Sequence, residues 1–133
     1  MYKRQIFDPI KNEMFYAEKD NGAFFNNQRI RVSNKSEINN CLFATGGKNK
    51  NEPDLTIRKS GSAALDMAYV AAGRYDGCFQ YNLNIWDIAA GIILVKEAGG
   101  MLNEIDLSNN KNIKIIASSA VINSKLLEKL ANF

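Results

Sequence analysis

An almost wholly apolar segment, residues 88–95, constrains the fold of this chain more than any other feature. Trp86 and Asp87 precede it, and Gly99-Gly100 follows it. A helix that is apolar on all sides has to be buried between other elements. We therefore predict a helix from Asp87 to about residue 98 inside a layered domain. It should pack against a sheet that contains residues 76–81, 101–105 and 113–117.

The other elements predict an α/β protein with two parts, residues 1–40 and 41–133. In the first part, short apolar strands alternate with turn signals such as Asp20-Asn21-Gly22, which predicts an antiparallel meander. In the second part helices and strands alternate, as in a mixed sheet flanked by helices. Leu126, Leu127 and Leu130 should share one face of a terminal helix. The predicted elements are strands at 5–7, 14–17, 23–25, 29–32 and 41–45, a helical turn within 33–40, a loop at 46–51, and helices at 61–73 and 123–132.

Composition limits the chemistry that this chain can perform. It has no histidine, which excludes histidine bases, triads and metal ligands. Catalysis would have to use carboxylates, hydroxyls, backbone amides or a metal held by oxygen. The net charge of +3 comes from interspersed Lys, Arg, Asp and Glu, which predicts no direct binding of nucleic acid.

The cysteines and the hydropathy pattern indicate a cytoplasmic protein. Cys41 and Cys78 lie far apart in apolar surroundings, and we expect both to be buried, reduced thiols. No signal peptide and no membrane-spanning segment is expected, because the longest apolar run is too short to cross a bilayer.

Asp87 is compatible with two roles. Aspartate caps helix N-termini well, and the residues alone favour this structural role. An aspartate at the start of a helix can also bind Mg²⁺, which prefers oxygen ligands and takes one or two carboxylates together with substrate phosphate. One carboxylate can serve both roles because it has two oxygens.

Ser60-Gly61-Ser62-Ala63-Ala64 also allows two interpretations. Its small residues would let a ligand approach the free amides at a helix start, but a serine cap on a packing helix explains them equally simply. Taken alone, Asp76-Gly77 predicts a turn before a strand. Gln80, also alone, predicts an outward-facing strand residue.

Together these segments resemble the C-terminal half of the inositol monophosphatase family. The resemblance rests on the runs Gly-Ser-Ala-Ala-Leu-Asp from residue 61, Ala-Ala-Gly-Arg-Tyr-Asp-Gly from 71, Trp-Asp-Ile-Ala-Ala-Gly from 86 and Glu-Ala-Gly-Gly from 97. It extends from about residue 6 to the end of the chain. It implies half of a layered sugar-phosphatase fold, in which the meander is the remainder of an N-terminal sheet.

The resemblance also implies a function and a set of site residues. The family hydrolyses phosphate monoesters of inositol and related polyols with Mg²⁺. Asp87 matches a metal-binding aspartate of the family, and Gly61, Ser62 and Ala63 match the segment that lines the polyol pocket. Gln80 stands where many members carry a glutamate that binds inositol hydroxyls. Family members are often homodimers, so a dimer is an expectation from resemblance only.

Three departures from the family pattern limit what this chain should do alone. The Glu-Glu and Asp-Pro-Ile-Asp-Gly-Thr motifs that supply most metal ligands are absent, so no complete catalytic set is expected without a missing N-terminal half. Gln80 is an amide where a charge is usual. The stretch between Thr45 and Gly61 is shorter than usual, which puts one pocket wall in doubt.

Two alternatives remain open at this point. The chain could be a non-catalytic binding or regulatory module of the same fold, since some bacterial members associate with transcription machinery. It could also belong to a phosphatase that acts on nucleotide or fructose bisphosphates.

Overall fold

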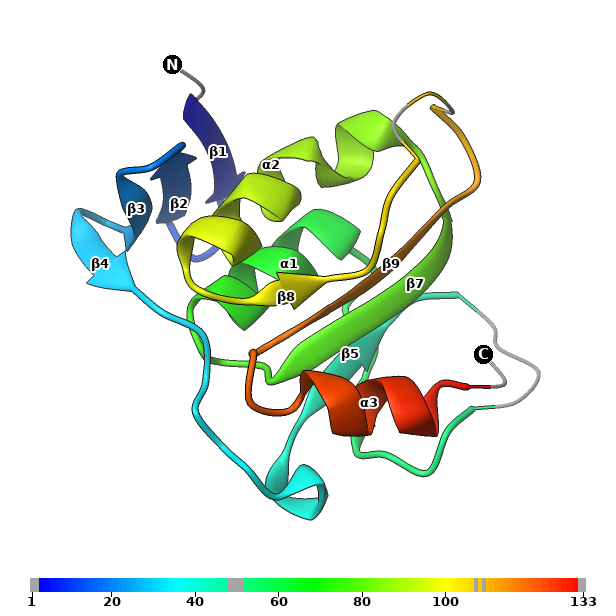
Figure 1. Ribbon diagram of the computed structural model, residues 1–133. Coiled ribbons are helices and arrows are strands. Elements are labelled where there is room, and N and C mark those ends of the chain that lie inside the picture. Colours follow the sequence, from blue (N-terminus) through cyan, green and yellow to red (C-terminus); the bar gives the residue numbers. More distant parts are fainter. Residues whose placement is uncertain (1–2, 48–51, 107, 109, 132–133) are drawn as a thin grey trace.

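The computed structural model describes residues 3–47, 52–106, 108 and 110–131. Two sheets and a pair of helices between them form the body of the molecule, and a third helix covers the far side of the second sheet (Figure 1). The loop predicted at 46–51 lies mostly outside the described residues. Its first two positions, Gly46 and Gly47, belong to no helix or strand.

The first sheet is the predicted antiparallel meander. Its strands β1 (Lys3–Asp8), β2 (Glu13–Glu18), β3 (Gly22–Phe25) and β4 (Gln28–Ile30) pair in chain order. Tight turns join them, and several turn residues adopt the left-handed backbone that Asn, Asp and Gly tolerate best. These are Asn12, Asp20, Gly22, Asn26 and Asn27.

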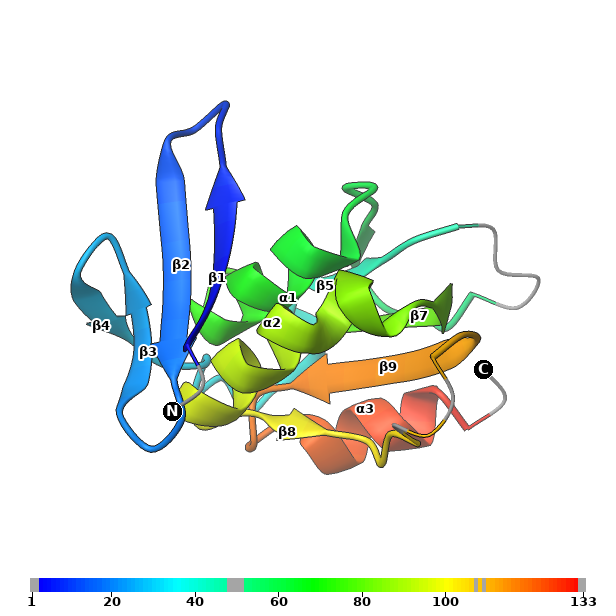
Figure 2. The same ribbon diagram turned by 90° about the horizontal axis from the view of Figure 1, so that it is seen from above.

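One face of this meander is buried and the other is not covered by any described element. Phe15, Ala17 and Ala23 are fully buried on the side that packs against the helices. On the opposite face Tyr16 stacks on Phe24, with ring centroids 5.2 Å apart, and Phe7 is 48% exposed. Figure 2 shows the helices on one side of the meander only.

The second sheet is mixed, as predicted. Its order is β6 (Ile57–Arg58), β5 (Phe43–Thr45), β7 (Gly77–Leu83), β9 (Ile113–Ser118) and β8 (Met101–Leu102). β5 runs parallel to both β6 and β7, whereas β9 runs antiparallel to β7 and β8. The predicted helical turn is a short 3-10 helix, η1 (Ile38–Asn40), before β5.

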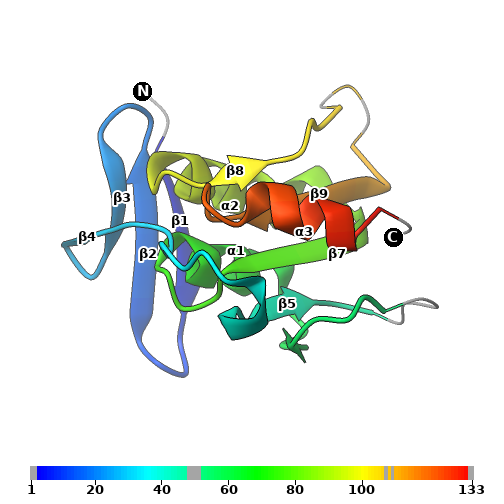
Figure 3. The ribbon, with the colours of Figure 1, turned by 60° about the horizontal axis from the view of Figure 1, so that its bottom comes forward.

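Helices α1 (Ala63–Ala71) and α2 (Ile85–Glu97) form the layer between the sheets. Gly91 of α2 faces Met67 of α1 so closely that a Cβ atom on Gly91 would lie 2.7 Å from the Met67 Cβ. The predicted packing of the apolar helix is confirmed, with contacts to both sheets. Helix α3 (Asn123–Lys129) covers the other face of the second sheet through Leu126 (Figure 3).

Three local predictions were wrong for identifiable reasons. Helix α2 begins at Ile85, because Asn84 is the N-cap, so Asp87 is not the cap. The strand predicted at 101–105 ends at Leu102, because the Asn103 side chain takes over hydrogen bonds to Ile116 N and Lys114 O of β9. Leu127 is 43% exposed, so the buried face of the terminal helix consists of Leu126 and Leu130.

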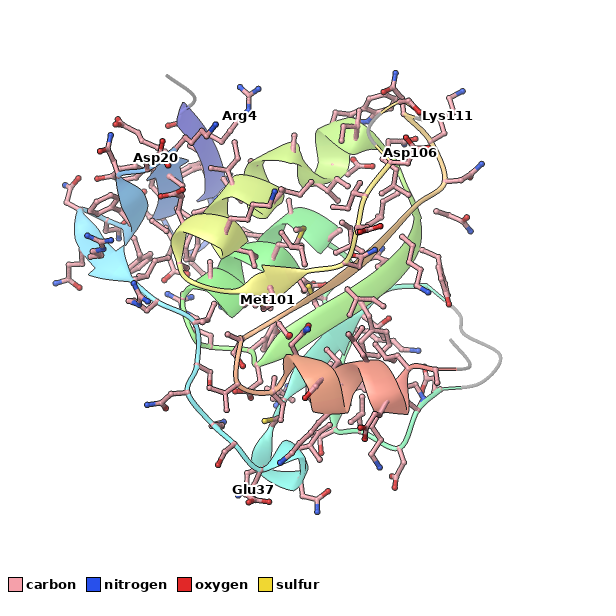
Figure 4. All side chains as sticks on the ribbon, viewed as in Figure 1. Arg4, Asp20, Glu37, Met101, Asp106 and Lys111 are labelled. Atoms are coloured by element: carbon pink, nitrogen blue, oxygen red, sulfur yellow. The ribbon has the colours of Figure 1, made fainter. Side chains whose placement is uncertain are left out.

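The remaining global expectations concern thiols, membrane segments and charge. Cys41 and Cys78 are both free and buried, as predicted. No helix in the described part of the chain has the length and apolarity needed to cross a membrane. Figure 4 labels five charged residues, Arg4, Asp20, Glu37, Asp106 and Lys111, which include both signs of charge.

Candidate functional site

A cavity of about 450 Å³ brings together three segments that are separate in the sequence. The segments are the start of α1, the end of β7 and the start of α2. Each residue that the resemblance singled out lines this cavity: Gly61, Ser62, Ala63, Gln80 and Asp87. Ala64, Leu83 and Trp86 complete the lining. The structure thus confirms the proximity of these residues, whereas their roles as ligands stay predictions.

The start of α1 forms one wall through a tight turn and a serine cap. Gly61 has a φ of +85°, a conformation that favours glycine. Ser62 is the N-cap, and its hydroxyl accepts a hydrogen bond from Leu65 N at 3.2 Å. The first amides of a helix have no intrahelical acceptor, so the amides of Ala63 and Ala64 are available at the cavity wall. The cap and the ligand-binding interpretations of this segment are therefore compatible.

A buried carboxylate lies behind this wall. Asp66 is 2% exposed and accepts a hydrogen bond from the Ser60 hydroxyl at 2.5 Å. Burial raises the pKa of Asp66 to about 6, although the bond from Ser60 acts in the opposite direction. Sequence reasoning missed this pair. The signal available was an aspartate inside an alanine-rich packing helix, preceded by a short serine-rich segment.

A β-bulge at the end of β7 supplies the second wall. Side chains alternate along a strand, so Gln80 and Leu83 would ordinarily point to opposite faces. The pairing of β7 with β9 shifts between these two residues, and Asn82 adopts a φ of +57°. This bulge turns both side chains toward the same cavity, as bulges beside functional sites commonly do. Gln80 therefore lines the cavity, and its contact with a ligand stays a prediction.

The residue after β5, Gly46, lies close to the Gln80 side chain. A Cβ atom on Gly46 would lie 2.6 Å from the Gln80 Nε2, so the absence of a side chain at Gly46 makes room for the amide. Gly46 follows β5, which runs parallel to β7. The cavity thus lies at the carboxyl end of β7, in a sheet of the kind where α/β proteins commonly bind ligands at strand ends.

The start of α2 carries the acidic group of the cavity. Asp87 is the third residue of the helix, and its Oδ2 accepts a hydrogen bond from Asn84 N at 3.2 Å. Asp87 is exposed, and Trp86 beside it is 67% exposed. The bond to Asn84 engages one carboxylate oxygen. The structural role and the metal-binding role that the sequence left open can therefore coexist.

The electrostatics of the cavity suit a cation held beside an anion. Two helix N-termini border it, and each carries a partial positive charge that favours a negatively charged group. Asp87 is the one ionisable side chain among the lining residues. Among the residues that the structure describes, no group of three or more His, Cys, Asp or Glu could hold a metal ion. Asp87 therefore fits a Mg²⁺ shell as one of its ligands, not as a complete site.

Asp76-Gly77, the third feature noted in the sequence, lies outside this cavity. Asp76 is 1% exposed and accepts hydrogen bonds from Leu42 N at 2.8 Å and Lys35 Nζ at 3.4 Å. Gly77 leaves no room for a side chain, because a Cβ atom would lie 2.9 Å from the Ala117 carbonyl oxygen. Both residues fix the start of β7, as the turn interpretation predicted.

The model of the "Inositol monophosphatase family" matches residues 5–132 of this sequence. The chain belongs to the inositol monophosphatase family. Among curated relatives, "Nus factor SuhB" of Haemophilus influenzae is 37% identical, over 94% of this chain and 53% of that protein. "Fructose-1,6-bisphosphatase/inositol-1-monophosphatase" of Thermotoga maritima is 44% identical, over 74% of this chain and 42% of that protein.

Solved structures of the inositol monophosphatase family share the fold described above. The inositol monophosphatase from Anabaena superimposes with a TM-score of 0.84 at 32% identity, covering 96% of this chain and 57% of that one. The chain thus spans about half the length of the family members that it matches. These matches confirm the predicted family and its layered α/β fold.

Proposed function

We propose that this chain forms the polyol-binding wall and one metal ligand of a Mg²⁺-dependent phosphomonoesterase. The substrate class is an inositol phosphate or a related polyol phosphate. The reaction needs groups supplied from outside this chain, namely the remaining metal ligands and the group that activates water. On this account the chain alone does not catalyse the reaction.

The observation that carries this proposal is the convergence of three segments on one cavity. Amides at the start of α1 and the Gln80 carboxamide can hydrogen-bond to polyol hydroxyls. Asp87, on α2, lines the same cavity and is exposed. A polyol phosphate presents both hydroxyls and a charged group, so this combination of donors and a single carboxylate suits it.

Asp87 would hold Mg²⁺ through a carboxylate oxygen. When bound, the metal would activate water and neutralise charge on the transferring phosphoryl group. Asp87 keeps its orientation through the bond that Oδ2 accepts from Asn84 N. A carboxylate fixed in this way loses little side-chain freedom when a cation binds. The free thiols of Cys41 and Cys78 support a reducing, cytoplasmic location for the enzyme.

The names of two relatives support alternative functions. The Thermotoga maritima relative is named for fructose-1,6-bisphosphate as well as inositol 1-phosphate, and the neutral amide of Gln80 does not discriminate between them. The Haemophilus influenzae relative is named a Nus factor, which supports a role in binding a protein partner. A homodimer is a further proposal, made by resemblance to the family.

A chimera tests the proposed function. The chain would be joined to the part of the Thermotoga maritima relative that it does not cover, and phosphate release from inositol 1-phosphate and fructose 1,6-bisphosphate would be measured with Mg²⁺ and with EDTA. We expect Mg²⁺-dependent release, faster with the inositol phosphate. No release from a folded chimera would contradict the enzyme assignment, and faster release from fructose 1,6-bisphosphate would favour the alternative substrate.

A further inference from the structure

The segment that forms the α1 wall of the cavity is tied to a buried carboxylate by consecutive hydrogen bonds. Ser62 N donates to the Ser60 Oγ at 3.2 Å, and the Ser60 hydroxyl donates to Asp66 Oδ1 at 2.5 Å. The hydroxyl also lies 3.4 Å from the Ser62 carbonyl oxygen, the longer of its two acceptor distances. A bond from a hydroxyl to a carboxylate is shorter and stronger than a bond between neutral groups. The Ser60 proton therefore belongs to the bond with Asp66.

We propose that Asp66 is a positioning residue of the candidate site, whose carboxylate fixes Ser60 and, through Ser60, the backbone of Gly61 and Ser62. Asp66 does not line the cavity itself. Gly61 has no atom other than those of its chain neighbours within 4 Å of the place where a Cβ would stand, so no packed neighbour supports the turn at that point. The hydrogen bonds of Ser60 hold the turn on the side before α1, and the bonds that Ser62 accepts from Leu65 N and Asp66 N hold it on the helix side. The inference rests on the proposed function only in treating this wall as part of a binding site.

The surroundings of Asp66 explain why its charge state should matter. Asp66 is 2% exposed, and burial raises the pKa of its carboxyl group to about 6. Two titratable groups feel its charge, Cys78 on β7 and Tyr75 after α1. The pKa of each is raised mainly by burial and, to a smaller extent, by the charge of Asp66. Arg58 of β6 acts on Tyr75 in the opposite direction. These thiol and phenol groups stay neutral near pH 6, so they do not compete with Asp66 for protons there.

The other elements packed on α1 carry ionisable groups that are engaged elsewhere or lie at their ends. Helix α2 contributes Asp87 at its start, and Lys96 and Glu97 at its end. Glu97 Oε1 accepts a hydrogen bond from Gly22 N at 2.9 Å. Asp8 of β1 accepts hydrogen bonds from the amides of Ile10 and Lys11. A pH-dependent change at Ser60 and its neighbours should therefore reflect the protonation of Asp66.

Backbone amide shifts measured by NMR against pH test this inference on the full chain. In the wild type, the amides of Gly61 and Ser62 should titrate together between pH 4.5 and 8, with a midpoint near about 6. Ser60→Ala removes the link and should reduce the amplitude at both amides at least threefold, while Asp66→Asn should abolish it. Asp8→Asn, which alters another buried carboxylate, should leave it intact.

Two results would overturn the positioning role. One is a pair of wild-type amides that do not shift across this pH range. The other is an unchanged titration in Ser60→Ala, a variant that changes an exposed position and keeps Asp66. Since no ligand is present in this measurement, its failure would leave the proposed function to be judged by the chimera alone.

Discussion

Asp66 is a carboxylate whose ionisation the folded state opposes. In the unfolded chain its pKa returns toward the ordinary value of 3.8, whereas burial raises it to about 6 in the fold. The folded state therefore binds the proton more tightly. The resulting stabilisation is complete below about pH 4 and is lost as the pH rises through about 6.

Asp66→Asn should accordingly make the protein more stable at neutral pH. The amide is neutral at every pH and can still accept a hydrogen bond from Ser60. We expect the free energy of unfolding at pH 7 to rise by about 1–3 kcal/mol, because each unit of pKa shift corresponds to about 1.4 kcal/mol. At pH 4 the gain should nearly vanish. Urea unfolding at both pH values measures this, with Asp54→Asn at an exposed position as control. An equal effect of Asp66→Asn at both pH values would contradict the expectation.

At the residue scale, sequence reasoning found the candidate site only through resemblance. Residue types alone favoured a structural explanation for Asp87 and an outward-facing position for Gln80. The bulge at Asn82 could not be foreseen, because a strand pattern carries no sign of an extra residue in the pairing. Trp86 and Leu83 were missed as lining residues for a different reason. Whether these side chains face the cavity depends on tertiary packing, which the sequence pattern does not show.

Arg74 joins the elements at the junction of the meander and the helices. Its guanidinium donates to both carboxylate oxygens of Glu13, at 2.8 and 2.7 Å. It also lies over the rings of Phe15, Phe25 and Tyr69, at 5.4, 5.0 and 4.8 Å from their centroids. The hydrogen bonds from Arg74 hold the pKa of Glu13 below its usual range. A planar guanidinium can bond to both oxygens of a carboxylate and stack on aromatic rings at the same time, whereas a lysine ammonium cannot.

Arg74→Lys should therefore loosen the meander from the helices. We expect a loss of about 1–2 kcal/mol at pH 7, from one exposed ion pair and the stacking on aromatic rings. Because Glu13 is stabilised in its charged form, the difference from wild type should shrink as the pH falls below about 4. Urea unfolding of Arg74→Lys measures the loss, and Arg58→Lys on the exposed β6 is the matched control. Equal stabilities of wild type and Arg74→Lys would contradict this role of Arg74 in joining the meander to the helices.

At the element scale, the sequence predicted most helices and strands but not all of their ends. Apolar composition, not periodicity, located α1 and α2, and short apolar runs located β7 and β9. The end of β8 depends on a side chain. The Asn103 carboxamide donates to Lys114 O and accepts from Ile116 N of β9, where a longer β8 would use its backbone. The start of α2 depends on a choice between two capping residues, Asn84 and Asp87, that sequence alone does not decide.

At the scale of the whole molecule, the chain is half of a family architecture. The uncovered meander face carries a stacked Tyr16–Phe24 pair and an exposed Phe7. Catalysis by in-line displacement with two metal ions needs ligands for both. The candidate cavity offers Asp87.

The isolated chain should therefore show negligible phosphatase activity. Purified chain would be assayed with Mg²⁺ and inositol 1-phosphate, beside the chimera at equal concentration. We expect the chain to release phosphate no faster than the buffer, while the chimera turns over. Turnover by the chain alone in the usual enzyme range of about 1–1000 s⁻¹ would refute the view that essential groups lie outside it.

Asp87→Asn in the chimera tests most directly whether the cavity is an active site. The substitution removes the charge that faces Mg²⁺ but keeps the size of the side chain and an oxygen that can accept from Asn84 N. We expect Mg²⁺-dependent turnover to fall by about a hundredfold or more, which corresponds to roughly 2.7 kcal/mol in the activation barrier. The free energy of unfolding should change by less than about 1 kcal/mol, the worth of a charge at a helix N-terminus. Unchanged turnover with a lowered thermal midpoint would show that Asp87 serves only the helix, and would contradict the proposed site.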